Sequence, residues 1–166
     1  MDANLAIPAP RFPIPRLVAP PRTKAARTLR DARSCYDHLA GRLGVAVTDA
    51  MAGRGLIAPD PVNDRLLVVT QAGARWFADF GVDTAPAAGR RIFARPCLDW
   101  TERRPHLAGA LGARLLSRLL ALGWVVRMEG GRGLRLTLAG VQGFKRALGV
   151  ELDEVSADSP ATRATG

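Results

Sequence analysis

Apolar residues recur at every fourth position in two stretches of the chain, and each stretch predicts one buried face of a helix. The two series are Leu39, Leu43, Val47 and Met51, and Leu107, Leu111, Leu115 and Leu119. A glycine follows each series, at Gly55 and Gly123, and a glycine in this position commonly ends a helix. The pattern therefore predicts two helices that stop at equivalent glycines.

Each predicted helix is followed by the same succession of strand, turn, strand and closing helix. The strands are expected at 56–57 and 66–70 around a turn at 59–64, and at 124–126 and 134–137 around a glycine-rich turn at 129–133. The closing helices carry Trp76, Phe77 and Phe80 in one copy, and Phe144 and Leu148 in the other. This order of elements describes a winged-helix unit, in which the hairpin is the wing.

The phrase His-Leu-Ala-Gly-x-Leu-Gly occurs at 38–44 and again at 106–112, an offset of 68 residues. Further glycine, threonine and phenylalanine positions correspond at offsets of 67 or 68 residues, so we interpret the chain as an internal duplication. The expected fold is α+β and mostly helical, with two tandem winged-helix-like repeats that carry short β-hairpin wings. We expect the repeats at 23–91, opened by a leading helix from about 23 to 40, and at 92–150.

The two ends of the chain differ in composition from the middle. Six prolines within residues 1–22 exclude a regular helix there and predict a disordered or extended arm. Residues 151–166 are polar and predict a disordered tail. The chain contains no apolar run long enough to span a bilayer, and two cysteines do not make a disulfide framework. A cytoplasmic location is the simplest expectation.

The chain carries a formal net charge of +9. Residues 1–22 contribute +2 and residues 151–166 contribute −3, so the middle of the chain, 23–150, carries +10. A basic folded surface attracts polyanions such as nucleic acid. Only two of the 24 basic residues are lysines, however, and an arginine-rich composition inherited from a GC-rich genome is the competing explanation. The charge therefore favours DNA only modestly.

Two longer phrases are specific enough to compare with a family: Ala-Arg-Ser-Cys-Tyr-Asp-His-Leu-Ala-Gly at 32–41, and Phe-Ala-Arg-Pro-Cys-Leu-Asp-Trp-Thr-Glu-Arg-Arg-Pro-His-Leu-Ala-Gly at 93–109. Both resemble the C-terminal portion of a group of bacterial ArsR-type winged-helix (helix-turn-helix) transcription regulators, over roughly residues 23–150. The resemblance implies a DNA-associated regulator, acting as a homodimer, in which the duplicated unit carries effector sensing and dimerisation.

Members of that group carry an additional N-terminal winged helix that reads the operator, whereas this chain has the proline-rich arm at that place. The family's DNA-reading helix therefore has no matching residues here. A truncated reading frame, a natural stand-alone partner and a regulator whose remaining modules bind DNA all stay open. The alternative functions are a stand-alone metal- or ligand-sensing module that acts through a protein partner without binding DNA, and a structural oligomerisation domain. No catalytic constellation is recognisable, so an enzyme is not expected.

The two histidines each lie near one of the two cysteines. Cys35 and His38 are three positions apart on the expected leading helix, hence on one face, and Cys97 and His106 lie in the corresponding part of the second copy. If the two copies pack symmetrically, these side chains converge, and Cys₂His₂ is a known ligand set for zinc. The alternatives are buried cysteines without a ligand, histidines that bond a neighbouring carbonyl, and a Cys35–Cys97 redox pair. No cofactor other than such a divalent metal is expected.

A second cluster consists of charged residues: Asp37, Asp99, Glu102, Arg103 and Arg104. Asp99 with Glu102 three residues later predicts a helix N-cap with its capping-box partner, and Arg104-Pro105 is an equally good helix start. A salt-bridge network between the copies is the default interpretation. The more specific hypothesis is a pocket for a small anionic effector.

Arg127, Arg132 and Arg135 lie on or beside the second predicted wing. Wings can place arginine on the phosphate backbone or in the minor groove, so these three are the candidate DNA contacts. A solvated basic hairpin is the more common alternative. Glycines at 130, 131 and 133 supply the tight turn and are not surrounded by the elements of a phosphate-binding loop.

Overall fold

The computed structural model of the protein describes residues 30–152, and the order hairpin, helix, hairpin, helix occurs twice along them. The first half contains β1 (Arg33–Cys35), β2 (His38–Ala40), α2 (Gly41–Gly53), β3 (Ile57–Pro59), β4 (Leu67–Val69) and α3 (Gln71–Phe80). The second half contains β5 (Arg95–Leu98), β6 (Pro105–Ala108), α4 (Gly109–Ala121), β7 (Val125–Arg127), β8 (Leu134–Leu136) and α5 (Leu138–Leu148). Together these elements make an α+β fold. With eight strands beside four helices in the described range, the expectation of a mostly helical chain is not confirmed.

The leading helix expected from 23 to 40 is wrong over residues 33–40, which form the antiparallel hairpin β1–β2. Cys35 pairs with His38, so Tyr36 and Asp37 make the turn. Tyr36 takes a φ of 57°, which is incompatible with a right-handed helix. The hairpin forms because β2 is buried at all three positions against the other half of the protein. Residues 23–29, the expected arm at 1–22 and the tail from 153 onward lie outside the described residues.

The corresponding hairpin of the second half, β5–β6, corrects two further expectations. Asp99 does not cap a helix but lies in the turn between the strands, where its Oδ1 accepts hydrogen bonds from the backbone N–H of Thr101 (2.9 Å) and Glu102 (3.2 Å). Pro105 opens strand β6 instead of a helix. A helix N-cap and this turn both need a side-chain oxygen that accepts hydrogen bonds from backbone N–H groups a few residues later. The sequence pattern around Asp99 therefore fits either structure.

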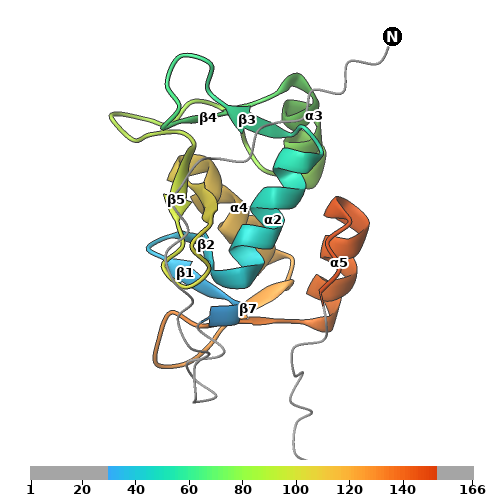
Figure 1. Ribbon diagram of the computed structural model, residues 1–166. Helices are drawn as coiled ribbons and strands as arrows, with labels where there is room; N and C mark the ends of the chain where they lie inside the picture. The colour runs from blue at the N-terminus through green and yellow to red at the C-terminus, as the bar shows by residue number, and fades with distance from the viewer. Residues whose placement is uncertain (1–29, 153–166) are drawn as a thin grey trace, which may run out of the picture.

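Helices α2 and α4 are the two apolar helices that the sequence predicts, and the last three residues of each predicted series lie on their buried faces. The first residue of each series, Leu39 or Leu107, lies instead in the preceding strand, β2 or β6. Gly55 and Gly123 follow them with φ of 66° and 65°, so both predicted helix stops are confirmed. Figure 1 places α2 and α4 in the middle of the molecule, with α3 and α5 on its outside. None of the helices within the described range is both long and apolar enough to cross a membrane.

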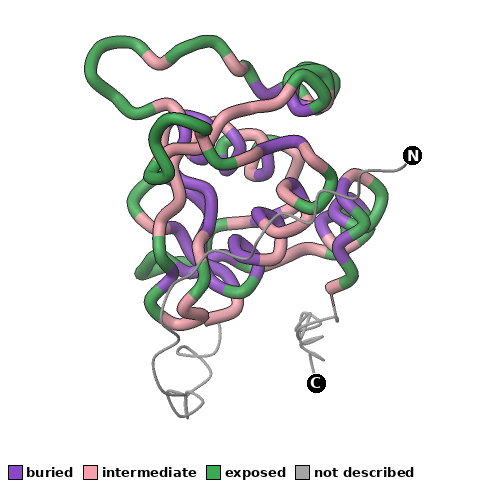
Figure 2. Tube along the Cα trace, turned by 45° about the horizontal axis from the view of Figure 1, so that its top comes forward, coloured by how far each residue is buried: buried purple, intermediate pink, exposed green. Residues whose placement is uncertain are grey.

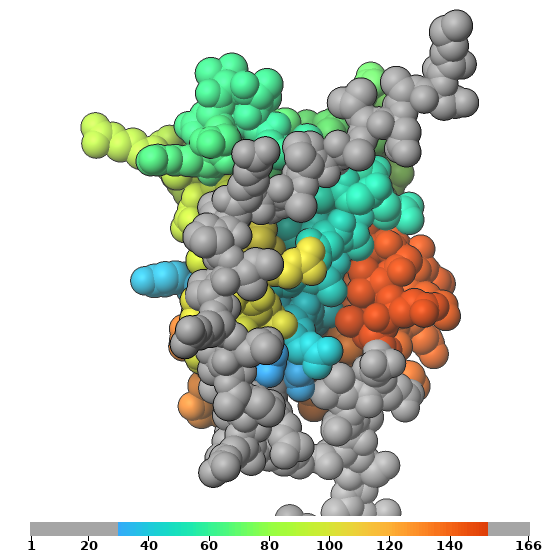
Figure 3. Space-filling model, in the orientation of Figure 1, coloured from blue at the N-terminus to red at the C-terminus, as the bar shows by residue number. Residues whose placement is uncertain are grey.

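The two hairpins that the sequence predicts after the central helices are present as β3–β4 and β7–β8. Each leads into its closing helix through a threonine cap. Thr70 Oγ1 accepts a hydrogen bond from Gly73 N (2.9 Å), and Thr137 Oγ1 accepts one from Gly140 N (3.0 Å). Such caps satisfy one of the unpaired N–H groups of a helix start. On the face shown in Figure 3, α5 in red packs beside α2 in cyan.

The two halves share one core and contact each other reciprocally. α2 packs against β6, and α4 packs against β2. A Cβ added to Gly112 would lie 3.1 Å from the Cβ of His38, and one added to Gly44 would lie 3.5 Å from the Cβ of His106. Each of these glycines in the repeated phrase therefore makes room for the histidine of the other half. Figure 2 shows the buried segments gathered in the middle of the molecule and exposed loops at its edges.

Candidate metal centre

The two short hairpins bring together Cys35, His38, Cys97 and His106, which we call the Cys/His cluster. Each cysteine is the direct cross-strand partner of a histidine: Cys35 of His38 in β1–β2, and Cys97 of His106 in β5–β6. Directly paired residues project from the same face of a sheet. Because β2 also contacts β6, the two Cys–His pairs meet. The structure thus gathers the four residues that the sequence suggested, although on strands and not on a helix.

The potential ligand atoms of the Cys/His cluster, the two Sγ atoms and one ring nitrogen from each histidine, all lie within 4.8 Å of one another. The Nε2 atoms of His38 and His106 are 3.1 Å apart, and the two rings are tilted by 36° with their centroids 5.1 Å apart. At that separation one Nε2 has to donate to the other, unless a cation lies between the lone pairs of both. The arrangement therefore suits either a histidine–histidine hydrogen bond or a shared metal.

Burial controls the charge of the Cys/His cluster. His38 is 3% exposed and His106 is 1% exposed. Burial, followed by repulsion from His106, lowers the pKa of His38, so the neutral imidazole that ligates metals is favoured. Burial also raises the pKa of Cys35, and the nearby Cys97 thiol raises it further. Without a cation the neutral thiol of Cys35 is favoured, and a bound cation would have to displace its proton.

Each histidine has a carboxylate beside the ring nitrogen that faces away from the other histidine. The Nδ1 of His106 lies 3.2 Å from Oδ2 of Asp99, although it is not aligned for a hydrogen bond. The Nδ1 of His38 lies 3.4 Å from Oδ1 of Asp37. A carboxylate at Nδ1 favours the tautomer that carries its proton there, which leaves Nε2 free to accept or to ligate.

Asp99 joins the Cys/His cluster to the rest of the molecule through contacts with the first half. Its two carboxylate oxygens each accept a 2.8 Å hydrogen bond from Arg33, and Oδ2 accepts a 2.7 Å bond from the backbone N–H of Gly41. Asp99 is fully buried, and Arg33 is 1% exposed. Burial raises the pKa of this carboxyl, but the neighbouring His106, Thr101 and Arg33 outweigh burial and hold the pKa far below its usual range. Asp99 is therefore a buried carboxylate.

Three other charged residues of the predicted cluster, Asp37, Glu102 and Arg104, form separate ion pairs. Asp37 pairs with Arg91 on the surface, and Arg104 pairs with Asp49 at 2.8 Å. The Nε of Arg103 is buried and has no hydrogen-bond partner within the described part of the chain. The structure does not gather these side chains with Asp99 in one pocket. Three pairs that involve cluster residues (Arg33–Asp99, Arg104–Asp49 and Arg30–Glu102) connect the two halves.

The predicted DNA contacts, Arg127, Arg132 and Arg135, are all exposed on the β7–β8 hairpin. The backbone of this hairpin is attached to the first half, because the carbonyl of Arg132 accepts a 2.9 Å hydrogen bond from Ser34 N. The three arginine side chains therefore stand on a fixed hairpin. Their contact with DNA stays a prediction.

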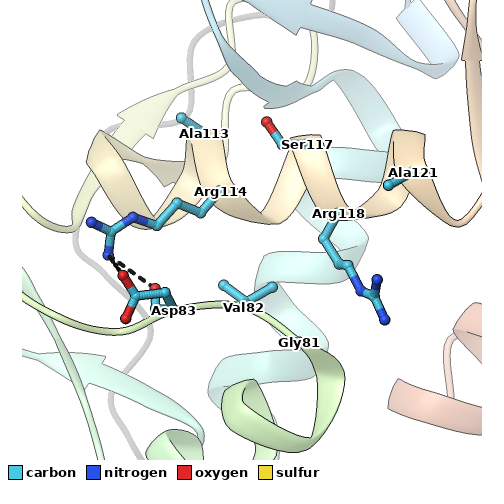
Figure 4. A pocket seen from close by; sticks show the side chains of 8 residues that line it. All are labelled: Gly81, Val82, Asp83, Ala113, Arg114, Ser117, Arg118 and Ala121. Atoms are coloured by element: carbon cyan, nitrogen blue, oxygen red, sulfur yellow. Dashed lines mark hydrogen bonds and ion pairs between the residues drawn. The ribbon is translucent and has the colours of Figure 1, made fainter.

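Sequence reasoning did not single out Arg33, because nothing in its local sequence marks a cation that pairs with a carboxylate 66 positions away. It also gave no indication of a groove of about 430 Å³ between the end of α3 and α4. Figure 4 shows this groove: Arg114 reaches across it to Asp83, and Arg118, which donates a hydrogen bond to the carbonyl of Phe80 (2.8 Å), lies at its other end. These contacts attach α3 to the second half. The groove is lined by none of the Cys/His cluster residues.

Comparison with known proteins gives one informative similarity. The chain is 40% identical over 131 residues to YdfF of Bacillus subtilis (strain 168), described as an uncharacterized HTH-type transcriptional regulator. The matched region covers 78% of this chain and 57% of that relative, so the chain spans little more than half the length of the protein it matches. No protein-family model and no solved structure matches the chain. The relative's name is that of a regulator, in agreement with the expectation that the chain is not an enzyme.

Proposed function

We propose that the chain acts in bacterial transcription regulation of the ArsR-like type, and that its duplicated unit is the effector-sensing and dimerisation part. The observation that carries the proposal is the 40% identity to an HTH-type transcriptional regulator over most of this chain. The phrases at 32–41 and 93–109 support the ArsR-like assignment, since they coincide with the two hairpins and the starts of the two central helices.

The burial of the central helices supports a sensing role over an operator-reading one. If each half is a winged-helix-like unit, α2 and α4 occupy the place of the recognition helix, directly before the wing. Seven residues of α2 are buried, and α4 is buried on the face that contacts β2. A helix that lies in the core cannot enter a major groove. Any DNA contact by residues 30–152 therefore falls on the wing arginines and the basic surface.

Homodimerisation has weaker but specific support from exposed apolar side chains on the two short hairpins. Tyr36 is 93% exposed in the β1–β2 turn, and Leu98 and Trp100 are 56% and 62% exposed at the β5–β6 turn. Large apolar side chains exposed at turns are typical of protein–protein contact sites. We propose that one or both of these turns contact a second copy of the chain.

The second candidate function is a metal- or ligand-sensing module that acts through a protein partner without binding DNA. The Cys/His cluster favours it, because a sensor site needs no operator-reading helix in the same chain. The two candidates share the sensing role and differ only in whether the chain itself reaches DNA. A cytoplasmic location belongs to both and stays a prediction.

A chromosomally tagged chain in its own organism tests the proposal. We expect chromatin immunoprecipitation to enrich a small set of promoters, and deletion of the gene to change transcription from the same promoters. Fluorescence anisotropy of the purified chain, with one of those promoters and a scrambled duplex, then separates the candidates. Preference for the promoter at physiological salt indicates direct DNA binding, whereas weak and equal binding that vanishes with salt indicates a partner. Absence of both promoter enrichment and transcript changes would refute the regulatory function.

A further inference from the structure

We propose that the Cys/His cluster is a four-coordinate binding site for one thiophilic divalent cation, with Zn²⁺ as the expected occupant. The site itself stands on geometry alone. Only its use as the sensor rests on the proposed regulatory function. The proposal goes beyond the sequence similarity, because the name of the similar regulator says nothing about a metal.

The distances fit a tetrahedral ion with small adjustments. Zinc bonds of about 2.0–2.1 Å to nitrogen and about 2.3 Å to sulfur place two ligating nitrogens about 3.3 Å apart and two sulfurs about 3.8 Å apart. The two Nε2 atoms are 3.1 Å apart, and no pair of ligand atoms is separated by more than 4.8 Å. Side-chain shifts of about 1 Å or less therefore close the site around an ion.

The donor set selects the class of metal. Two thiolates and two imidazoles prefer zinc and other soft or borderline ions, whereas Mg²⁺ and Ca²⁺ prefer oxygen ligands. Four protein ligands also leave no open position for water, which is typical of zinc that stabilises or senses and not of zinc that catalyses. The buried histidines close the inner side of the site, and the half-buried Cys35 and Cys97 leave a route from the surface.

The surroundings of the Cys/His cluster are already arranged for ligation. Asp99 and Asp37 lie beside the Nδ1 atoms of the two histidines, and Asp99 is itself fixed by Arg33 from the other half. Carboxylates in this position orient ligating imidazoles and increase their basicity. Asp99 is thus a positioning residue. A bound ion would also fasten β1–β2 to β5–β6, since each hairpin supplies one cysteine and one histidine.

Cobalt titration of the full-length chain, purified under reducing conditions and stripped with a chelator, tests the site directly. Tetrahedral Co²⁺ gives intense visible bands, and a thiolate ligand adds near-ultraviolet charge-transfer bands. We expect both to saturate at one Co²⁺ per chain, and Zn²⁺ to displace the cobalt. Excess Mg²⁺ should leave the bands unchanged. Weak octahedral spectra, or no saturation at one equivalent, would overturn the proposal.

Matched variants assign the ligands. Cys35→Ser and Cys97→Ser should each weaken Zn²⁺ affinity, measured by competition with a chromophoric chelator, by about 100-fold or more, and should remove charge-transfer intensity. Tyr36→Phe changes a side chain that is 93% exposed in the same turn and should leave affinity and spectrum unchanged. Circular dichroism of the stripped variants confirms that they are folded. If both cysteine variants kept the wild-type Zn²⁺ affinity, the site would be refuted, because any metal bound by the chain would then lie elsewhere.

The sensing role has its own readout. In cells, Zn²⁺ excess or chelation should change promoter enrichment of the wild-type chain but not of Cys97→Ser. Stoichiometric metal binding without this response would leave the metal site intact and refute sensing. A third outcome is a chain that binds no metal and whose promoter enrichment does not change with Zn²⁺. That outcome would support the regulatory function and overturn the metal proposal.

Discussion

Two glycine-to-alanine substitutions, Gly112→Ala and Gly53→Ala, should change the stability of the protein in opposite directions. Both glycines lie in central helices, Gly112 in α4 and Gly53 at the end of α2, and neither takes a positive φ. In an unobstructed helix, alanine is more stable than glycine by about 0.5–1 kcal/mol because glycine loses more backbone entropy on folding. The difference between the two sites must therefore come from packing.

The space around the two glycines differs sharply. A Cβ at Gly53 meets nothing within 4 Å, so we expect Gly53→Ala to stabilise the fold by about 0.5–1 kcal/mol. A Cβ at Gly112 would lie 2.5 Å from the carbonyl oxygen of Leu107 and 3.1 Å from the Cβ of His38. The obstruction is backbone and the base of a buried side chain, so no flexible group can move aside. We expect Gly112→Ala to destabilise by about 1–3 kcal/mol after the helix gain.

Urea unfolding of the metal-free chain, followed by circular dichroism, measures both values. The midpoint should rise for Gly53→Ala and fall for Gly112→Ala, with similar denaturant slopes. In thermal unfolding the Gly112 variant should melt lower by roughly 4–12 °C. A Gly112→Ala protein as stable as the wild type would refute the close packing of α4 against the His38 hairpin, and with it the explanation of the repeated glycine.

Three further predictions concern the site and the surface. Asp99→Asn should weaken Co²⁺ affinity by about 10–100-fold while the tetrahedral spectrum persists, because the ligands remain but lose an orienting carboxylate; an unchanged affinity in the folded variant would contradict that role. Arg33→Met removes one partner of a buried ion pair and should cost about 3–5 kcal/mol in urea unfolding, whereas Arg104→Ala, with a side chain 61% exposed, should cost less than about 1 kcal/mol. Equal costs would show that burial does not set the strength of these pairs. Replacing Arg127, Arg132 and Arg135 together by alanine should lower the salt slope of DNA binding in anisotropy by up to about 3, since each lost phosphate contact removes about 0.9; an unchanged slope would exclude the wing.

The parts of the fold that the sequence predicted are those whose signal is local and long. The four-residue apolar period of α2 and α4 persists over several turns, and Gly55 and Gly123 mark their ends with a conformation that favours glycine. The β3–β4 and β7–β8 hairpins are bounded by turn residues, and their strands were located to within one or two positions. In each case a short segment contains enough information to choose its own structure.

The short hairpins were not predictable in this way. Strands of three or four residues are too short to display alternation, and the β1–β2 turn places Tyr36 at a positive φ without a glycine or proline to signal it. The segment around it is rich in alanine, arginine and leucine, which favour a helix in isolation. Burial of β2 against α4 overrides that preference, and this contact is visible only in the folded protein.

The convergence of the two Cys–His pairs was suggested correctly although the secondary structure assigned to them was wrong, and the reason is geometric. Residues three apart lie on one face of a helix, and residues three apart that flank a two-residue turn are direct partners on one face of a hairpin. Either structure therefore keeps Cys35 beside His38. The two Cys–His pairs then meet if the second half repeats the arrangement and faces the first, and the reciprocal contacts of Gly44 and Gly112 with the opposite histidines show that it does. The pairing of Arg33 with Asp99 could not be predicted in the same way. A single ion pair between distant segments produces no repeating pattern in the sequence of either segment.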